Sequence, residues 1–282
     1  MIFNNYQFII RRMNHMVRSE NQVANPVRTN IELSEKVLEL NKQLEQEPEN
    51  AELWIKRGLA LVEQNLMREA VESYSKALCL DPFNWLGYRN RAHRHLSCWE
   101  FQEACSDFIM STRLVPNTVD IHEIWEAWYL LALSHYLLGE YEKAADAYKT
   151  CYSLAHGDDI ITTTGWYWST LMRLGRKEEA ENILAFITKD MKFEASREAY
   201  FSTLRMFKGW VSPEDTEAQC NMPDCKDKFT RLYAISNYYY ITGDLENSNR
   251  VIDRILEEAG PQWWMVFGYL AAMVDKKARS NA

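Results

Sequence analysis

The chain has 282 residues, of which 47% are hydrophobic, 10 are glycine and 7 are proline. This length and apolar content suffice for a substantial core, and the shortage of turn residues favours an all-helical protein over a sheet protein. The formal net charge of -8 argues against a nucleic-acid partner, because nucleic-acid-binding surfaces are strongly basic.

The first thirty residues are expected to form a flexible N-terminal extension. Residues 1–30 lack a steady hydrophobic period and end near Pro26. The main apolar patch, Phe8 to Ile10, is followed by two arginines and is too short for a signal peptide or a membrane span. We therefore expect a cytoplasmic protein that has no membrane partner.

A capping helix is predicted next, over residues 31–46. Apolar residues recur there at helical spacing, and the segment is followed by the letters EPEN. A similar ending, DPFN, closes the stretch 51–84. We interpret 31–46 as half of a helical hairpin that precedes the first full unit.

Residues 51–84 read as two antiparallel helices that end at an Asp-Pro pair. Gly58 and Ala70 are small where the two helices are expected to cross, and Trp54 and Tyr74 supply bulk on either side of the crossing. One such hairpin cannot bury its own apolar face, so it predicts further copies along the chain.

Further copies follow along the chain at a regular interval. The second unit, 85–118, has a residue of the same or a similar kind 34 positions after each of five residues of the first, and a third unit follows at 125–158 after a short insertion. The pattern, with its repeat length of about 34 residues, resembles the tetratricopeptide repeat (TPR) family. The resemblance implies stacked helical hairpins and an activity of binding other molecules.

Three weaker units are placed at 161–190, 195–220 and 229–260. Gly175 and Gly243 fall in the expected turns and are separated by two repeat lengths, and the midpoint between them, position 209, is also glycine. The second helix of the fifth unit is expected to be short and to start at Ser212-Pro213.

The predicted fold is an all-α superhelix, a TPR solenoid of about six helix-turn-helix units over 31–282. A C-terminal helix, 262–277, caps the open end. This end is rich in aromatic residues, so a homodimer through the last helix is an alternative to capping. The C-terminal third also loosely resembles the NlpI-type bacterial TPR adaptors.

The TPR resemblance also implies where a partner binds. The first helix of each TPR unit faces a concave groove, and the residues at those positions combine aromatic rings with polar donors, as suits a peptide or protein segment. Some of these residues could instead pack against the neighbouring unit. The candidate contacts are Arg89, His93, Tyr129, Tyr136, Ser169, Arg173, Tyr233, Asn237 and Tyr240.

A second hypothesis concerns the basic segment 85–99, which contains no acidic residue. Arg89 and His93 lie four positions apart and so share one helix face, where they could bind a small anionic ligand or form part of an enzyme's active site. The structural alternative is that Arg91 and His95 occupy inward positions and find acidic partners on the adjoining helix.

Catalysis, metals and cofactors have little support in the sequence. There is no phosphate-binding loop, nucleophile elbow or HExxH motif. Cys220 and Cys225 have no second ligand pair at zinc-site spacing, and the six cysteines resemble buried hydrophobic residues of a reducing compartment. The sequence therefore predicts a non-catalytic scaffold or adaptor with no cofactor and no metal.

Overall fold

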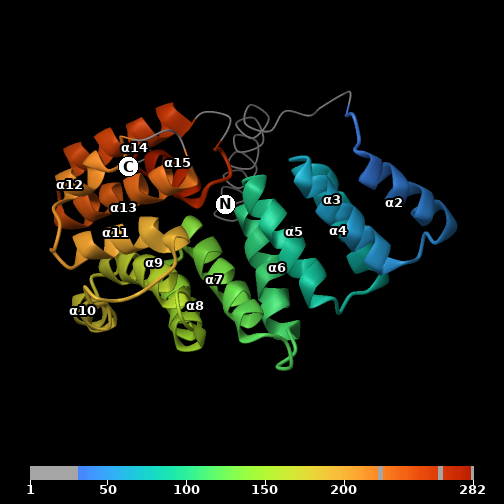
Figure 1. Ribbon diagram of the computed structural model, residues 1–282, viewed down its shortest axis with the longest axis horizontal. Helices are drawn as coiled ribbons and strands as arrows, with labels where there is room; N and C mark the ends of the chain where they lie inside the picture. Colours follow the sequence, from blue (N-terminus) through green and yellow to red (C-terminus); the bar gives the residue numbers. More distant parts are fainter. Residues whose placement is uncertain (1–30, 222–224, 260–262, 281–282) are drawn as a thin grey trace, which may run out of the picture. The chain divides into compact units, whose positions relative to one another are not determined.

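A computed structural model describes residues 31–221, 225–259 and 263–280 (Figure 1). The extension expected over residues 1–30 lies outside the described residues. Within them every regular element is a helix, and no strand occurs. This confirms the predicted all-α fold class.

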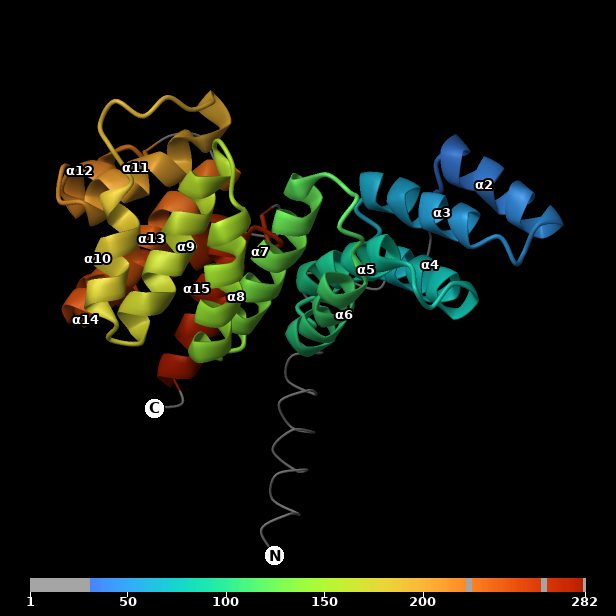
Figure 2. The same ribbon diagram turned by 90° about the horizontal axis from the view of Figure 1, so that it is seen from below.

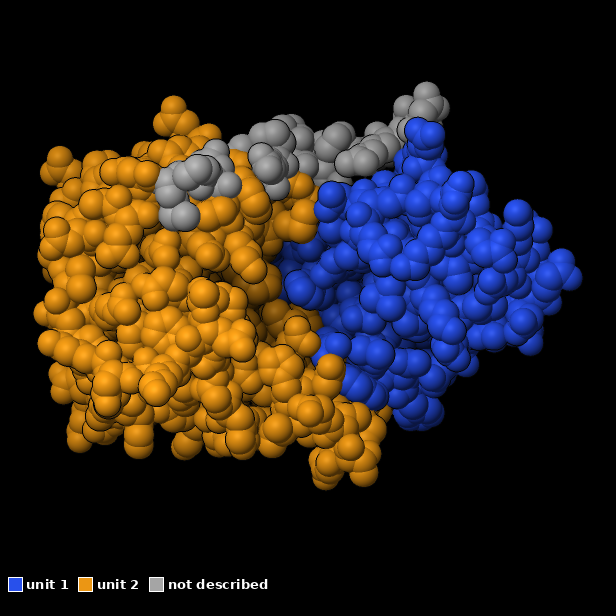
Figure 3. Space-filling view, viewed as in Figure 1, with its two compact units in different colours: residues 1–104 blue, residues 105–282 orange. Residues whose placement is uncertain are grey.

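The described residues fall into two compact units, which divide after Ala104 (Figure 3). Helix α6 (Phe101–Leu114) crosses this division. The other helices of unit 1 are α2 (Glu35–Gln46), α3 (Ala51–Glu63), α4 (Met67–Leu80) and α5 (Trp85–Ser97). The other helices of unit 2 are α7 (Ile121–Leu137), α8 (Tyr141–Leu154), α9 (Asp159–Arg173), α10 (Lys177–Ala185), α11 (Glu198–Phe207), α12 (Pro213–Ala218), α13 (Lys226–Thr242), α14 (Leu245–Ala259) and α15 (Phe267–Ser280), with a short 3-10 turn, Ala195–Arg197, before α11.

The EPEN and DPFN segments act as helix starts. The side chain of Asn50 accepts a hydrogen bond from the backbone N–H of Leu53 at 3.2 Å, and that of Asn84 accepts one from Gly87 at 2.8 Å. Each bond satisfies an N–H group that has no partner inside the helix, which contributes about 1 kcal/mol. The two asparagines therefore start the first helices of two successive repeat units.

Each helical hairpin turns through a residue with positive φ, between 59° and 90°. Four of these residues are glycine, for which this conformation costs little. Asparagine also adopts this conformation fairly readily, but it costs most other residues about 1–2 kcal/mol, so Trp99 carries local strain. In chain order the residues are Asn65, Trp99, Gly139, Gly175, Gly209 and Gly243, and they mark the six hairpins that the sequence predicted.

The crossing in the first hairpin depends on Gly58. A methyl group at this position would lie 2.7 Å from Cζ of Tyr74, and Tyr74 and Ala70 are fully buried. The close approach lets α3 and α4 bury one shared core with α2, which contributes Val37, Leu40 and Leu44. Unit 1 thus has its own hydrophobic core.

In unit 2 the first helices of successive hairpins pack on one another. Helix α9 contacts α7, α11 and α13, while α15 contacts α13 and also α7. The second helices flank them, so that α9 lies between α8 and α10 (Figure 2). We call the surface where α7, α9, α11, α13 and α15 meet the inner face of unit 2.

Candidate binding site on the inner face of unit 2

Four of the predicted groove residues meet in one polar cluster on the inner face. Tyr136 comes from α7, Arg173 from the last turn of α9, and Tyr233 and Asn237 from α13. The hydroxyls of Tyr136 and Tyr233 are 2.7 Å apart, and the side-chain oxygen of Asn237 accepts a hydrogen bond from Nε of Arg173 at 2.7 Å. The structure therefore brings together residues that lie up to 101 positions apart in sequence.

Asp275 of α15 completes this cluster. Its carboxylate accepts a bidentate pair of hydrogen bonds from Arg173, with Nη1 to Oδ1 at 2.9 Å and a shorter contact from Nη2 to Oδ2. Both side chains are only 6% exposed. Sequence analysis missed Asp275, although a signal exists: it follows Gly268, Ala271 and Ala272 on the buried stripe of α15, where an acidic residue needs a partner.

Tyr240 lies at the outer edge of the cluster. Its ring is flanked by two guanidinium groups, those of Arg173 at 4.9 Å and Arg279 at 4.5 Å from the ring centroid. The residue is 39% exposed, so it is the most accessible of the predicted contacts in this region. Cation–π contacts of this kind contribute about 0.5–1 kcal/mol each at exposed positions.

The electrostatics of the cluster keep its hydroxyls protonated and its arginine charged. Burial raises the pKa of Tyr136 and Tyr233 far above the ordinary tyrosine value. Burial opposes the charge of Arg173, but Tyr136, Tyr233 and Asp275 together raise its pKa above the usual range. The amide nitrogen of Asn237 has no hydrogen-bond partner among the described residues.

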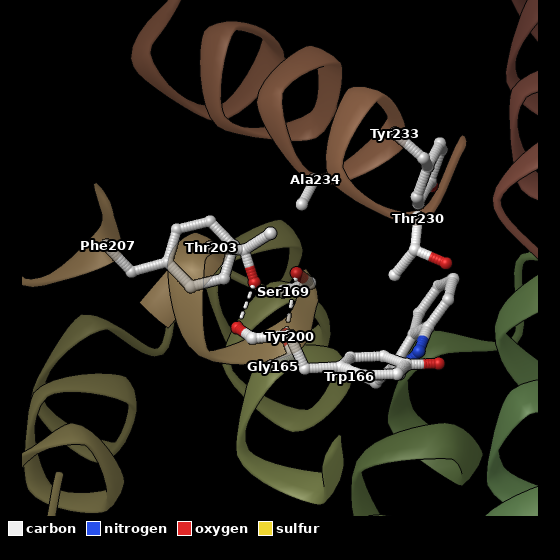
Figure 4. A pocket seen from close by; sticks show the side chains of 9 residues that line it. All are labelled: Gly165, Trp166, Ser169, Tyr200, Thr203, Phe207, Thr230, Tyr233 and Ala234. Atoms are coloured by element: carbon white, nitrogen blue, oxygen red, sulfur yellow. Dashed lines mark hydrogen bonds between the residues drawn. The ribbon is translucent and has the colours of Figure 1, made fainter. Parts of the chain in front are cut away.

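A pocket lies beside the polar cluster and shares Tyr233 with it (Figure 4). The space between its lining atoms amounts to about 300 Å³, a figure that includes the mouth open to solvent. Gly165 and Ser169 form its wall on α9, and Tyr233 and Ala234 face them from α13. The full lining is Gly165, Trp166, Ser169, Tyr200, Thr203, Phe207, Thr230, Tyr233 and Ala234.

The pocket residues follow the groove positions of the repeat. Gly165 and Ser169 are one helical turn apart on α9, as are Thr203 and Phe207 on α11, and this i, i+4 spacing puts each pair on one helix face. Sequence analysis named Ser169 and Tyr233 but missed the rest of the lining. The i, i+4 spacing could have identified the missing residues. It places Thr203 and Phe207, in the degenerate fifth unit, on the helix face that corresponds to that of Gly165 and Ser169.

The other predicted contacts lie elsewhere. Tyr129 is buried in α7, where its ring stacks on that of Trp125 with centroids 5.2 Å apart. Arg89 and His93 belong to α5 of unit 1, and the guanidinium of Arg89 lies 5.3 Å from the ring centroid of Trp85. A role of the nine residues as partner contacts stays a prediction, and the observed contacts of the buried ones are internal.

His93 is a poor ligand for an anion. Burial lowers its pKa to about 3, and the charges of Arg94 and Arg89 act in the same direction. The imidazole is therefore neutral at pH 7 and brings no positive charge to the basic segment of α5. This weakens the hypothesis of a small anionic ligand held by Arg89 and His93.

The lowered pKa of His93 predicts that the folded protein becomes less stable in acid. An unfolded histidine has a pKa of about 6.5, so below that pH the unfolded chain binds a proton that the folded chain does not. The free energy of unfolding should fall by up to about 1.4 kcal/mol per pH unit between pH 6.5 and 3. Urea unfolding near pH 7 and pH 4.5 should show a smaller loss for His93→Gln than for the unchanged protein. Equal losses would mean that His93 is already charged when folded.

A cysteine-histidine-glutamate arrangement in unit 2 resembles a catalytic triad but is structural. Nδ1 of His135 is 2.7 Å from Glu140, and its ring nitrogens are 3.6 and 3.7 Å from Sγ of Cys105. Burial raises the pKa of Cys105 to about 11, so its thiolate is scarce at pH 7. The same pair recurs in unit 1, where His95 and Glu100 are 2.8 Å apart. Because the His–Glu pair occurs at the turn of two hairpins, we interpret it as an interaction that stabilises the turn.

Metal-binding clusters and membrane-spanning helices are both absent from the part of the chain that the structure describes. No group of three or more His, Cys, Asp or Glu side chains there could hold a metal ion. Within the same residues, no helix combines the length and apolar character needed to cross a membrane. The six cysteines are free thiols, and four of them, Cys98, Cys105, Cys151 and Cys220, are buried.

Comparison with protein families finds repeats at the positions of two hairpins. Residues 51–84 match the tetratricopeptide repeat family, and residues 125–158 match it separately. No curated protein matches the chain in sequence.

Solved structures share the fold. A tetratricopeptide repeat protein from Parabacteroides merdae ATCC 43184 is 15% identical, with a TM-score of 0.55, and the match covers 95% of this chain and 99% of that one. A chain of the APC/C hetero-tetramer Cut9-Hcn1 is 18% identical, with a TM-score of 0.52, over 93% of this chain and 48% of that one. These likenesses extend the helical-repeat architecture over nearly the whole chain.

Proposed function

Since this chain is a tetratricopeptide repeat protein, we propose that it is a non-catalytic interaction scaffold that binds a peptide or protein segment at the inner face of unit 2. The observation that carries the proposal is the pocket between α9, α11 and α13, because it is concave, partly open and lined by aromatic rings. Binding sites of proteins combine these properties with a few polar groups that fix orientation.

The rim of the pocket is suited to a partner. Tyr200, Phe207, Thr230 and Ala234 are half-buried, whereas the floor residues are buried. The ring of Phe207 stacks on Trp168 with centroids 3.9 Å apart. A side chain held in this way loses little conformational freedom on binding, which favours affinity.

The polar cluster would orient the bound segment from one side of the pocket. Tyr240 is exposed there beside the guanidinium group of Arg279, whereas the charge of Arg173 is matched by Asp275. Backbone carbonyl groups of a peptide could accept hydrogen bonds at such an edge. The proposal therefore combines apolar contacts in the pocket with polar contacts near Tyr240.

Photocrosslinking tests the proposal. A p-benzoylphenylalanine at Phe207 replaces one aromatic residue by another at the pocket rim, and the same substitution at Phe186 supplies a matched control. Phe186 is 68% exposed and follows α10, outside the pocket lining. On irradiation in a native lysate, we expect a protein adduct from position 207 that is absent from position 186.

The readout is mass spectrometry of the adducts together with the melting temperature of each variant. Adducts that are identical at both positions would show collisional labelling and would contradict the proposal. A folded Phe207 variant that gives no adduct at all would do the same.

The proposal includes the setting in which the scaffold acts. We propose a cytoplasmic protein with a protein partner and no nucleic-acid partner, in keeping with the net charge of -8. A homodimer through the aromatic C-terminal end remains an alternative assembly. The burial of Trp264 and the packing of α15 on α13 and α14 favour capping over this dimer.

A further inference from the structure

Gly165 lines the pocket on the inner face of unit 2 and borders open space. This residue lies in the middle of α9, where a glycine costs about 0.5–1 kcal/mol relative to alanine. A methyl group at Gly165 would meet no atom within 4 Å, so no close contact between helices requires the glycine. By contrast, a methyl group at Gly58 or Gly268 would collide with a neighbouring helix.

The three serine and threonine hydroxyls of the pocket already donate hydrogen bonds to their own helices. Ser169 donates to the carbonyl of Gly165 at 2.9 Å, and Thr203 donates to that of Tyr200 at 2.7 Å. Thr230 donates in the same way to Lys226 at 2.9 Å. A carboxylate or carbonyl group entering the pocket would therefore find no free donor among these three hydroxyls, which disfavours its desolvation there.

The aromatic rings do not form a cage for a cation. Trp166 and Tyr233 stack on one another with centroids 5.5 Å apart and planes 25° apart, so their faces are turned toward each other. A cation cage needs several ring faces directed at one point. No charged side chain lines the pocket. An uncharged hydrocarbon group fits this uncharged, mainly apolar lining best.

The size of the space limits this group further. The space between the lining atoms amounts to about 300 Å³ only when the open mouth is counted, so the pocket is too small to enclose a drug-sized molecule. We propose that the pocket receives a single aliphatic side chain of about the size of leucine from the bound segment, and that Gly165 is the residue that admits it. This inference rests on the proposed function, because the side chain belongs to the segment that the scaffold binds.

Small probes test the pocket directly in the full-length protein. The probes are the N-acetyl amides of leucine, asparagine and trimethyllysine, and binding is measured by saturation-transfer NMR. Leucine and asparagine side chains have nearly the same shape, so they separate apolar from polar recognition. We expect a signal for the leucine amide and none for the other two. Equal signals for all three, or no leucine signal, would overturn the inference.

Two substitutions close the pocket from opposite helices. Gly165→Ala adds a methyl group on α9, and Ala234→Leu adds bulk on α13. Each should reduce the leucine signal at least fivefold. Ala185→Leu adds the same atoms as Ala234→Leu at an exposed position of α10 and should leave the signal unchanged. An undiminished signal in Gly165→Ala, with an unchanged or higher melting temperature, would overturn the inference.

A combined experiment separates this inference from the proposed function. The Phe207 crosslinking is repeated with Gly165→Ala in the same chain, and we expect the partner adduct to be lost. An adduct that persists would overturn the role of the pocket while leaving the scaffold function intact. A leucine signal without any partner adduct in the otherwise unchanged protein would support the pocket and contradict the scaffold function.

Discussion

Gly268→Ala is expected to lower the free energy of unfolding by about 3 kcal/mol or more, because the new methyl group collides with backbone rather than with a flexible side chain. It would lie 2.8 Å from the carbonyl carbon of Phe229 and 3.2 Å from the nitrogen of Thr230, and nearer still to the Phe229 oxygen. Helix α15 can accommodate this only by moving away from α13. Urea unfolding followed by circular dichroism measures the effect.

The matched control is Gly165→Ala, which makes the same chemical change inside another helix of the same unit. No atom lies within 4 Å of the added methyl group, so we expect no loss and a gain of up to about 1 kcal/mol from helix propensity. If both substitutions have the same effect, close approach of α15 to α13 is not what Gly268 provides.

The second large effect is expected at the buried ion pair. Asp275→Leu should cost about 3–5 kcal/mol, since it leaves the charge of Arg173 buried without its carboxylate partner. Arg173→Met should cost somewhat less, because Nη2 of Arg279 still lies 3.6 Å from the carboxylate of Asp275. Removing both charges together should cost less than the sum of the two losses by at least about 1 kcal/mol. The double variant will not be neutral, because Arg173 also donates to Asn237 and Tyr141.

A double-mutant cycle of unfolding free energies tests this expectation. Additive losses would show that Arg173 and Asp275 do not stabilise one another. As a control for the loss of any surface ion pair, Lys276→Met breaks the contact of Lys276 with Asp253, where both side chains are about half exposed. Exposed pairs contribute about 0–1 kcal/mol, so this change should be small.

The hairpins could be predicted from sequence because they depend on local features. Small residues at the crossings, asparagine caps and turn glycines recur at fixed spacing, and each acts within one or two helices. Trp99 shows the limit of this reasoning. It occupies the same position in the second unit as Asn65 in the first and adopts the same left-handed turn conformation, although tryptophan itself does not favour that conformation.

The candidate site was only partly predictable. The repeat register placed Tyr136, Arg173 and Tyr233 on the same side of their helices, and the structure joins them in one buried cluster, while their role as partner contacts stays a prediction. The sequence could not show how closely successive hairpins of unit 2 pack on one another. This packing decides whether the residues on the inner face are exposed to a partner or buried. Asp275 could not be predicted because its partner, Arg173, lies 102 residues away in sequence. The pocket could not be predicted because it involves a position, Gly165, that has no side chain to indicate a role.

The contact between α15 and α7 has a consequence for how unit 2 unfolds. In an open array of repeats each hairpin touches only its neighbours, so the ends can fray while the middle stays folded. In unit 2 the last helix reaches back to the first hairpin, and the ion pair of Asp275 with Arg173 ties it to the second. Loss of the C-terminal helix therefore weakens hairpins at both ends of the unit, and unit 2 should lose its structure as one cooperative body.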